Sequence, residues 1–263
     1  MRNIRYRLTT DHPHISFKAC VVADLHDRPY GKILPILKNE RPDLILIPGD
    51  LTEQFDTAPA HVPHPGLELL AECAAIAPTF YALGNHEIGG CHRNIRESKR
   101  MRAEKKPIPF EITPSDKRAV AFTGAILLYQ SYTVWNGLVI GGLGSGLLNP
   151  GWIPDLGWLD EYVRTPGYKL LMSHHPEYYD RYLRPLDIDL TVSGHAHGGQ
   201  WRFLGRGVYA PDQGLFPKYT GGLHEGRLII SRGVANTVPF VPRFFNPCEV
   251  VTVEVRTDTV AKR

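Results

Sequence analysis

The stretch Val192–Gln200 reads Val-Ser-Gly-His-Ala-His-Gly-Gly-Gln and decides how the rest of the chain is interpreted. The run Ile188–Val192 that leads into it predicts a buried strand, and the glycines predict a tight turn. His195 and His197 stand two residues apart, so both imidazoles face the same side of an extended segment. Imidazole is the commonest metal ligand in proteins, and these two need further ligands to complete a shell. The alternative is a pair of histidines on an ordinary surface turn, unless other strand ends supply matching ligands.

Strands and helices alternate along the first third of the chain. Helical spacing is present at Ile33–Asn39 and Leu67–Ala77 and recurs at Asp155–Val163, whereas apolar runs separated by turn residues predict strands. The main predicted strands are Phe17–Ala23, Asp43–Ile47, Thr79–Leu83, Tyr168–Met172, Ile188–Val192, Arg227–Arg232 and Glu249–Val255. This alternation favours an α/β fold. Because strands occur in both halves, we expect two sheets that pack face to face.

The middle of the chain predicts a different arrangement. Three short runs follow one another closely, at Ala125–Leu128, Tyr132–Trp135 and Leu138–Gly142. Short strands joined by turns are typical of an antiparallel meander. No low-complexity linker interrupts the sequence, so we expect residues 1–263 to form a single domain.

Polar residues with ligand-type side chains follow five of the predicted strands. In open α/β sheets, sites lie at the carboxyl ends of strands, where such residues come together. The candidates are Asp24, His26, Asp50, Asn85, His174, His195 and His197. Two carboxylates, one amide oxygen and four imidazoles suffice for two divalent ions that share one carboxylate. This mixture of nitrogen and oxygen ligands suits Mn, Fe or Zn better than Ca or Mg.

Composition indicates the compartment and the partners of the protein. The net charge of +3 is too small to indicate nucleic-acid binding by itself. Four cysteines without framework spacing indicate a reducing compartment, so we expect a cytoplasmic protein. The basic segment Met1–Thr10 lacks the apolar core of a signal peptide, and no apolar stretch is long enough to span a bilayer.

The order of the motifs resembles that of the calcineurin-like metallophosphoesterase superfamily. Asp-x-His, Gly-Asp, Gly-Asn-His-Glu, His and Gly-His-x-His follow one another between Asp24 and His197. Each motif is weak alone, but five in this order are specific. Ser231-Arg232-Gly233 and Pro242–Glu249 further resemble a bacterial branch related to membrane-anchored phosphoesterases. That branch often carries an N-terminal transmembrane anchor, which we do not expect here.

The resemblance implies a fold and a set of ligands. The fold is a four-layer α/β sandwich, in which helices flank two central mixed β-sheets. One metal would be held by Asp24, His26, Asp50 and His197, and the other by Asp50, Asn85, His174 and His195. Asp50 would therefore bridge the two ions. His174 is preferred to His175 because the family histidine lies two residues before a proline, as His174 does before Pro176.

The resemblance also implies an activity. Two cations lower the pKa of a bridging water, and the resulting hydroxide attacks phosphorus in line with the leaving oxygen. The expected enzyme hydrolyses phosphodiesters or phosphomonoesters of small molecules. His86 would act as general acid or as a donor to the transition state. Arg28 and Arg243 are candidates for binding the substrate phosphate, but the favoured alternative is that each is solvated or structural.

Three rival functions are less well supported by the sequence. The basic stretch Arg93–Lys106 would suit a nuclease, but no aromatic-rich stacking strip accompanies it, and it could be a solvated face or a basic rim that attracts anionic substrates. A non-catalytic scaffold is disfavoured because every candidate ligand and His86 are present. Protein phosphatases carry arginines where this chain has Leu51-Thr52-Glu53 and Leu83, so that activity is also disfavoured. We expect a phosphorylated small molecule as partner and infer no protein partner.

Overall fold

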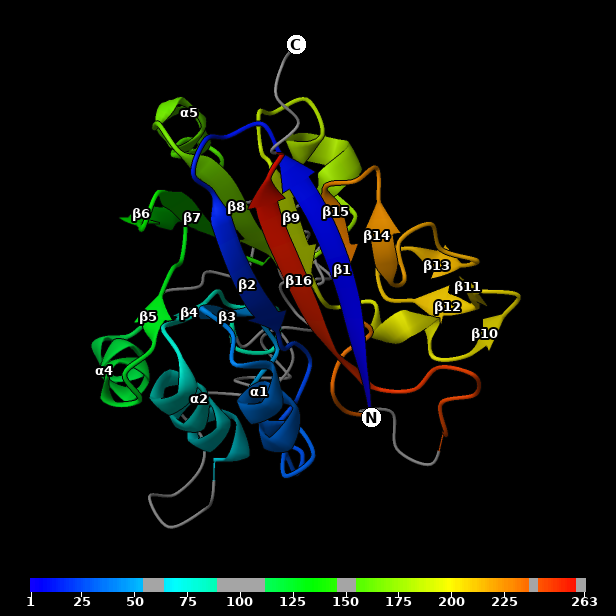
Figure 1. Ribbon diagram of the computed structural model, residues 1–263. Coiled ribbons are helices and arrows are strands. Elements are labelled where there is room, and N and C mark those ends of the chain that lie inside the picture. The colour runs from blue at the N-terminus through cyan, green and yellow to red at the C-terminus, as the bar shows by residue number, and fades with distance from the viewer. Residues whose placement is uncertain (54–63, 89–111, 146–154, 237–240, 259–263) are drawn as a thin grey trace, which may run out of the picture.

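A computed structural model describes residues 1–53, 64–88, 112–145, 155–236 and 241–258 (Figure 1). Its first mixed sheet has six strands. In spatial order they are β1 (Arg2–Thr10), β16 (Glu249–Thr257), β2 (Ser16–Val21), β3 (Leu44–Ile47), β4 (Thr79–Tyr81) and β5 (Ile126–Leu127). Strands β2 to β5 are parallel, whereas β16 is antiparallel to β2 and parallel to β1.

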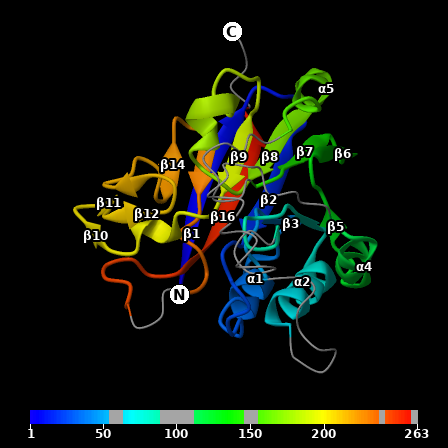
Figure 2. The same cartoon turned by 180° about the vertical axis from the view of Figure 1, so that it is seen from behind.

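The second mixed sheet also has six strands. In spatial order they are β14 (Gly222–His224), β15 (Leu228–Ile230), β9 (Leu190–Ser193), β8 (Tyr168–Ser173), β7 (Leu138–Leu143) and β6 (Ser131–Trp135). The four inner strands are parallel, and each edge strand is antiparallel to its neighbour. The two sheets lie face to face in both views of the molecule (Figures 1 and 2).

Helices and short hairpins complete the described part of the chain. The helices are α1 (Leu34–Glu40), α2 (Pro65–Ile76), α4 (Pro114–Phe122), α5 (Leu159–Arg164) and a π-helical turn at Tyr179–Leu183. Two hairpins follow β9, built from β10 (Arg202–Phe203) with β11 (Arg206–Gly207) and from β12 (Tyr209–Ala210) with β13 (Gly214–Leu215). Among the described residues, no helix combines the length and apolarity needed to cross a bilayer.

The alternation of side chains along β3 shows how the layers form. All four of its residues are buried, because successive side chains of a strand face opposite sides and both sides of this sheet are covered. Leu44 and Leu46 pack between the two sheets, together with Leu170 of β8. Ile45 and Ile47 pack on the other face, in a cluster that includes residues of α1 and α2. A third cluster joins the outer face of the second sheet to α5. The predicted four-layer α/β sandwich is confirmed.

Two details of the prediction were wrong. No strand was expected at Met1–Thr10, yet β1 pairs with β16 along its whole length. Its sequence lacks a continuous apolar run because it is an edge strand, in which only alternate residues are half-buried. No meander forms in the middle of the chain, because β5 pairs with β4 in the first sheet, whereas β6 and β7 belong to the second. The assignment of the whole chain to one domain stays a prediction.

Candidate metal centre

The seven candidate ligands lie where strands of both sheets end. Parallel strands present their carboxyl ends at one edge of a sheet, which explains why residues so far apart in sequence meet. The loops after β2, β3 and β4 supply Asp24, His26, Asp50 and Asn85, and those after β8 and β9 supply His174, His195 and His197. All are buried except His197, which is partly exposed. The centre therefore lies between the two sheets at their shared end.

The backbone at the centre is unusual. Five of the seven candidates adopt a left-handed conformation, with φ between 46° and 66°, which non-glycine residues seldom do. They are Asp24, His26, Asp50, His195 and His197. Backbone strain of this kind persists at functional sites, where the surrounding structure enforces it. Close approach adds a second constraint, since a Cβ on Gly84 would lie 2.1 Å from Oδ1 of Asp50. Only glycine fits there.

Asp24, His26 and His197 form a first group of potential ligands. Each offers one ligand atom, and these atoms lie within 4.8 Å of one another. Three buried atoms of the group have no hydrogen-bond partner among the described residues, namely Oδ2 of Asp24, Nε2 of His26 and Nδ1 of His197. A buried polar atom without a partner is costly and calls for an explanation. A divalent cation that these atoms coordinate would supply one.

Asp50, His174 and His195 form a second group, whose ligand atoms also lie within 4.8 Å of one another. Nδ1 of His174 is 2.9 Å from the carbonyl oxygen of Pro48, to which it can only donate. In the neutral ring Nε2 of His174 then carries the lone pair, and this atom lies 3.0 Å from Oδ2 of Asp50. Oδ1 of Asn85 is 3.1 Å from the same nitrogen. These atoms are the kind that bind a second ion.

Asp50 lies between the two groups. Its Oδ2 is 3.6 Å from Nε2 of His26, which belongs to the first group. Burial would raise the pKa of Asp50, but His174 and other nearby imidazoles outweigh it and hold that pKa well below the usual range. The pKa of Asp24, by contrast, is raised, chiefly by burial. A charged carboxylate between two groups of ligands is what a shared ligand requires.

His86 contacts both Asp50 and a carboxylate that the sequence did not reveal as part of the centre. The backbone N–H of His86 donates to Oδ1 of Asp50 at 3.0 Å, and Nδ1 of its ring lies 2.7 Å from Oε2 of Glu53. Burial lowers the pKa of His86, but Asp50 and Glu53 outweigh it and raise that pKa to about 9. The side chain is 23% exposed, far more than those of His26 or His174. His86 can therefore reach a bound substrate while it carries a proton.

Two carboxylates outside the candidate ligand set, those of Glu53 and Asp212, contact histidines of the centre. Glu53 also contacts His26, with 3.2 Å between Oε1 and Nδ1. Oδ2 of Asp212 lies 3.0 Å from Nε2 of His195. Such partners fix the tautomer and the orientation of ligand imidazoles. Glu53 follows Asp50 by three residues and could have been suspected, but Asp212 lies in the distant turn between β12 and β13 and leaves no signal in the sequence.

His175 contacts a member of the second group, His195, but does not belong to that group. Its ring centroid is 4.0 Å from that of His195, and its Nδ1 is 2.8 Å from Oε1 of Glu177. The pKa of Glu177 is lowered to about 2, because the contact with His175 outweighs the effect of burial. These contacts support the preference for His174 as ligand and give His175 a supporting role, although both assignments stay proposals.

The two arginines predicted to bind substrate have different surroundings. The guanidinium group of Arg243 donates to backbone carbonyls of His197 and Arg232 and to Sγ of Cys248. These contacts brace the loop that contains His197. Arg28 is exposed and lines a pocket of about 590 Å³ with Lys32, and no candidate ligand lines that pocket. Substrate binding by either arginine stays a prediction, and the basic stretch Arg93–Lys106 lies outside the described residues.

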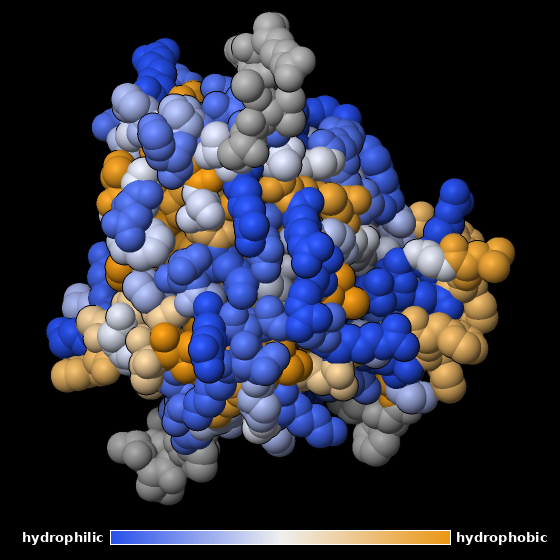
Figure 3. Space-filling model, viewed as in Figure 1, coloured by the Kyte–Doolittle hydropathy of each residue, from blue (hydrophilic) through white to orange (hydrophobic). Residues whose placement is uncertain are grey.

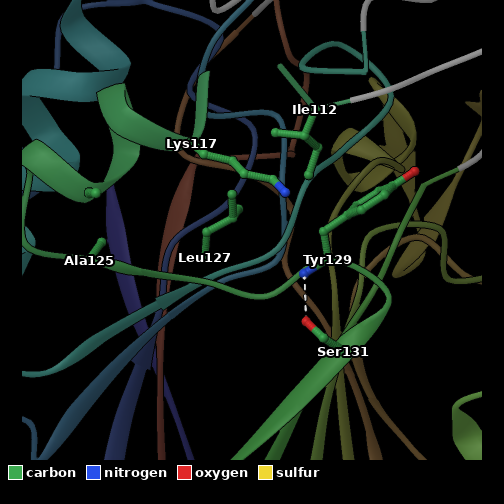
Figure 4. A pocket seen from close by; sticks show the side chains of 7 residues that line it. Ile112, Lys117, Ala125, Leu127, Tyr129 and Ser131 are labelled. Carbon is green, nitrogen blue, oxygen red and sulfur yellow. Dashed lines mark hydrogen bonds between the residues drawn. The ribbon is translucent and has the colours of Figure 1, made fainter. Parts of the chain in front are cut away.

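Another pocket, of about 660 Å³, lies beside α4 and β5 (Figure 4). Its lining is largely apolar, with Ile112, Ala125 and Leu127 around the side chain of Lys117. None of the seven candidate ligands lines it. The candidate metal centre therefore lies outside this pocket.

Comparison with known proteins connects the centre to a family. A sequence model of the calcineurin-like phosphoesterases matches residues 17–199, a span that contains all seven candidate ligands. The chain is 27% identical over 246 residues to the uncharacterized metallophosphoesterase Cj0846 of Campylobacter jejuni. The aligned region covers 89% of this chain and 56% of that protein. The chain thus spans little more than half the length of that relative.

Two further similarities were found. The phosphodiesterase YaeI of Escherichia coli is 28% identical over 252 residues, which cover 89% of this chain and 81% of YaeI. Among solved structures, a metallophosphoesterase from Sphaerobacter thermophilus matches with a TM-score of 0.31 and 15% identity, over 70% of this chain and 61% of that one.

Proposed function

This chain belongs to the calcineurin-like phosphoesterase family, and from that premise we propose that it is a binuclear metal-dependent enzyme that hydrolyses phosphoesters of small molecules. The observation that carries the proposal is the convergence of three unpartnered buried atoms, on Asp24, His26 and His197, beside the group around Asp50. Structural ion-pair networks satisfy their own polar atoms, whereas this cluster leaves three buried polar atoms without a hydrogen-bond partner among the described residues.

The residues divide into two ligand sets that share Asp50. Asp24, His26, Asp50 and His197 would hold one ion, and Asp50, Asn85, His174 and His195 the other. Mn, Fe and Zn suit these ligands, because imidazole nitrogen and carboxylate oxygen are both well represented. When bound, such ions lower the pKa of water and neutralise the charge of a phosphoryl group.

The chain's own residues complete the chemistry. His86 holds a proton at the partly exposed side of the centre and would give it to the leaving oxygen, as a general acid does. Glu53 orients the His86 ring through Nδ1 and so directs Nε2 toward the reacting groups, with Nε2 lying 4.0 Å from Oδ2 of Asp50. Glu53 thus acts as a positioning residue that does not itself touch the substrate.

The name of a relative, and not the geometry of the candidate metal centre, favours one substrate class. YaeI carries the name phosphodiesterase, which favours diesters over monoesters for this chain. A nuclease is the second candidate, motivated by the basic stretch Arg93–Lys106, and its activity on oligonucleotides would fall steeply with salt. A scaffold without activity is disfavoured by the complete set of ligands. We also propose a cytoplasmic location, supported by the free cysteines Cys20, Cys73 and Cys248.

Metal content and activity on two synthetic esters test the proposal together. The protein is stripped with chelator, reloaded with Mn, Fe or Zn, and assayed on bis(p-nitrophenyl) phosphate and p-nitrophenyl phosphate, with the ions counted by elemental analysis. We expect two ions per chain, no turnover without them, and faster turnover of the diester. A folded protein that binds fewer than two ions at saturation would contradict the binuclear centre, and full turnover after stripping would contradict metal dependence.

A further inference from the structure

Large apolar side chains project from one side of the molecule, away from the helices α1 and α2. Figure 3 shows them as orange surface at the right-hand edge, over the hairpins β10–β11 and β12–β13. Leu204 is fully exposed, and Phe245, Phe216 and Leu215 are 70–77% exposed. We call this set the apolar loop surface, and its members are Trp201, Phe203, Leu204, Leu215, Phe216, Phe244 and Phe245.

The apolar loop surface is built on hydrogen-bonded backbone. A β-bridge joins Trp201 to Phe244, and the rings of Phe203 and Phe245 lie 6.3 Å apart. The N–H of Phe216 donates to the carbonyl of Val208 at 2.8 Å, which ties the second hairpin to the first. The side chains are therefore held outward together. A contiguous exposed patch of this kind marks a site of interaction with a partner.

An exposed arginine lies beside the apolar loop surface. Of the charged residues in 201–218 and 241–248, Arg202 is buried and donates to the backbone carbonyls of Gly198 and Gly205. Arg243 donates to the backbone carbonyls of His197 and Arg232. Asp212 is engaged by His195, and Lys218 by Asp180 at 2.8 Å. Arg206 is exposed in the same turn as Leu204, and no ion pair is found for it within the described residues. The partner should therefore be anionic as well as apolar.

We propose that the apolar loop surface binds the interface of a membrane that contains anionic lipid. Leu204 lies in the tight turn of the hairpin β10–β11 and Phe245 in a bend, and both side chains are largely exposed, which suits insertion among lipid chains. Aromatic and leucine side chains beside arginine are the combination that anchors proteins in the headgroup region. Each basic residue near such a surface adds attraction to anionic lipid.

The apolar loop surface adjoins the candidate metal centre. Trp201 follows His197 by four residues, and Nδ2 of Asn246 donates to the carbonyl of His197 at 2.7 Å. A membrane bound at Trp201 and Phe245 would therefore be held beside the centre. The proposal does not depend on catalysis, because it rests on exposed side chains and charge, so its test can be kept apart from activity.

Co-sedimentation with vesicles tests the proposal. The full chain is mixed with vesicles of phosphatidylcholine alone or with added phosphatidylglycerol, and the bound fraction is measured. The double variant L204E/F245E should bind roughly tenfold more weakly or worse, because charges replace the inserted apolar groups. Arg206→Gln should weaken binding roughly fivefold on anionic vesicles and leave binding to neutral ones unchanged. Phe122→Glu is the matched control, since Phe122 is 90% exposed at the end of α4.

Folding and self-association are followed in the same samples. Thermal unfolding of each variant should match that of the unchanged protein, and Phe216→Glu in the second hairpin provides an independent variant. The proposal is overturned if the unchanged protein binds neither kind of vesicle, or if Phe122→Glu weakens binding as much as L204E/F245E. A dimer that L204E/F245E dissociates, without vesicle binding, would also overturn it and assign the surface to a second copy of the chain.

Discussion

A single carboxylate, that of Glu53, holds the two histidines His26 and His86, which have different expected roles. Its oxygens lie 3.2 Å from Nδ1 of His26 and 2.7 Å from Nδ1 of His86. Both imidazoles thereby direct Nε2 away from Glu53. Burial would raise the pKa of Glu53, but the contacts with His26 and His86 outweigh it and lower that pKa, so the group is anionic at neutral pH. The candidate centre therefore depends on Glu53, a carboxylate outside the candidate ligand set, as well as on its ligands.

Glu53→Gln should slow catalysis without removing a ligand. An amide keeps the size of the side chain but loses the charge that orients both rings, and loss of such a partner typically costs about 10–100-fold in activity or metal affinity. The kcat on the diester and the bound metal are measured together. Glu68→Gln is the control, because the hydrogen bond that Glu68 accepts from Tyr30 is exposed. Equal kcat in the two variants would mean that Glu53 does not position His86.

His86→Ala should affect esters according to their leaving group. An alkoxide needs a proton in the transition state, whereas a nitrophenolate leaves without one, and general-acid catalysis is typically worth about 10²–10⁴-fold. We therefore expect a severe loss of kcat on an alkyl phosphoester and a much smaller loss on a nitrophenyl ester. Metal content is measured in the same samples, since His86 lies next to Asn85. If both esters slow equally while both ions are bound, the proton comes from water.

The residues of the centre differ in how visible they are in the sequence. Asp24, His26 and Asn85 were found because each follows an apolar run within a short motif. Asp212 could not be found, because its contact with His195 spans 17 residues and depends on how the hairpin β12–β13 folds back. Sequence patterns report local order, whereas this contact is tertiary.

At the scale of elements, Glu87 joins the loops that follow β3 and β4. Its buried carboxylate accepts hydrogen bonds from the backbone N–H groups of Asp50, Leu51, Thr52 and Gly84 and from the hydroxyl of Tyr81. Two strand ends are thus held at a fixed separation, with Asp50 on one and Asn85 on the other. The motif residue Glu87 is structural here, although it stands beside His86.

Glu87→Ala should lower the free energy of unfolding by about 3–5 kcal/mol, because several buried N–H groups would lose their acceptor together. Urea unfolding monitored by fluorescence measures the change. Glu68→Ala on the exposed face of α2 should change the same quantity by less than about 0.5 kcal/mol. If Glu87→Ala unfolds at the same urea concentration as the unchanged protein, the loops are held by other contacts.

Elements were predicted well where they are buried and poorly where they are not. β3 is apolar throughout and β8 is apolar over Leu170–Met172, so their sequences predict buried strands, and every residue of both is buried. The edge strand β1 is half-polar, and its partner β16 lies at the other end of the chain. The sequence also does not show that the chain passes from the first sheet at β5 to the second sheet at β6, because both are short strands on either side of a turn. Pairing between strands is set by the whole fold.

At the scale of the molecule, the candidate ligands come from both central sheets. Asp24, His26, Asp50 and Asn85 follow strands of the first sheet, whereas His174, His195 and His197 follow strands of the second. Ions bound by both sets would connect the two sheets at one end. Unfolding separates the sheets and disperses the ligands, so metal binding should stabilise the native fold specifically.

Thermal unfolding with and without metal tests this coupling. A ligand at about 100 times its Kd stabilises the native state by about 2.7 kcal/mol, which raises Tm by roughly 5–10 °C in a chain of this size. The unchanged protein should show that rise with Mn, Fe or Zn, and Asp50→Asn should lose most of it, because an amide cannot offset the repulsion of two close cations. Asp43→Asn is a matched control, since Asp43 lies at the opposite end of β3 and accepts from the N–H of Lys18 at 2.7 Å. Its metal-induced rise should equal that of the unchanged protein. A full rise in Asp50→Asn would remove Asp50 from the centre, and no rise in the unchanged protein would mean that these ligands do not bind metal between the sheets.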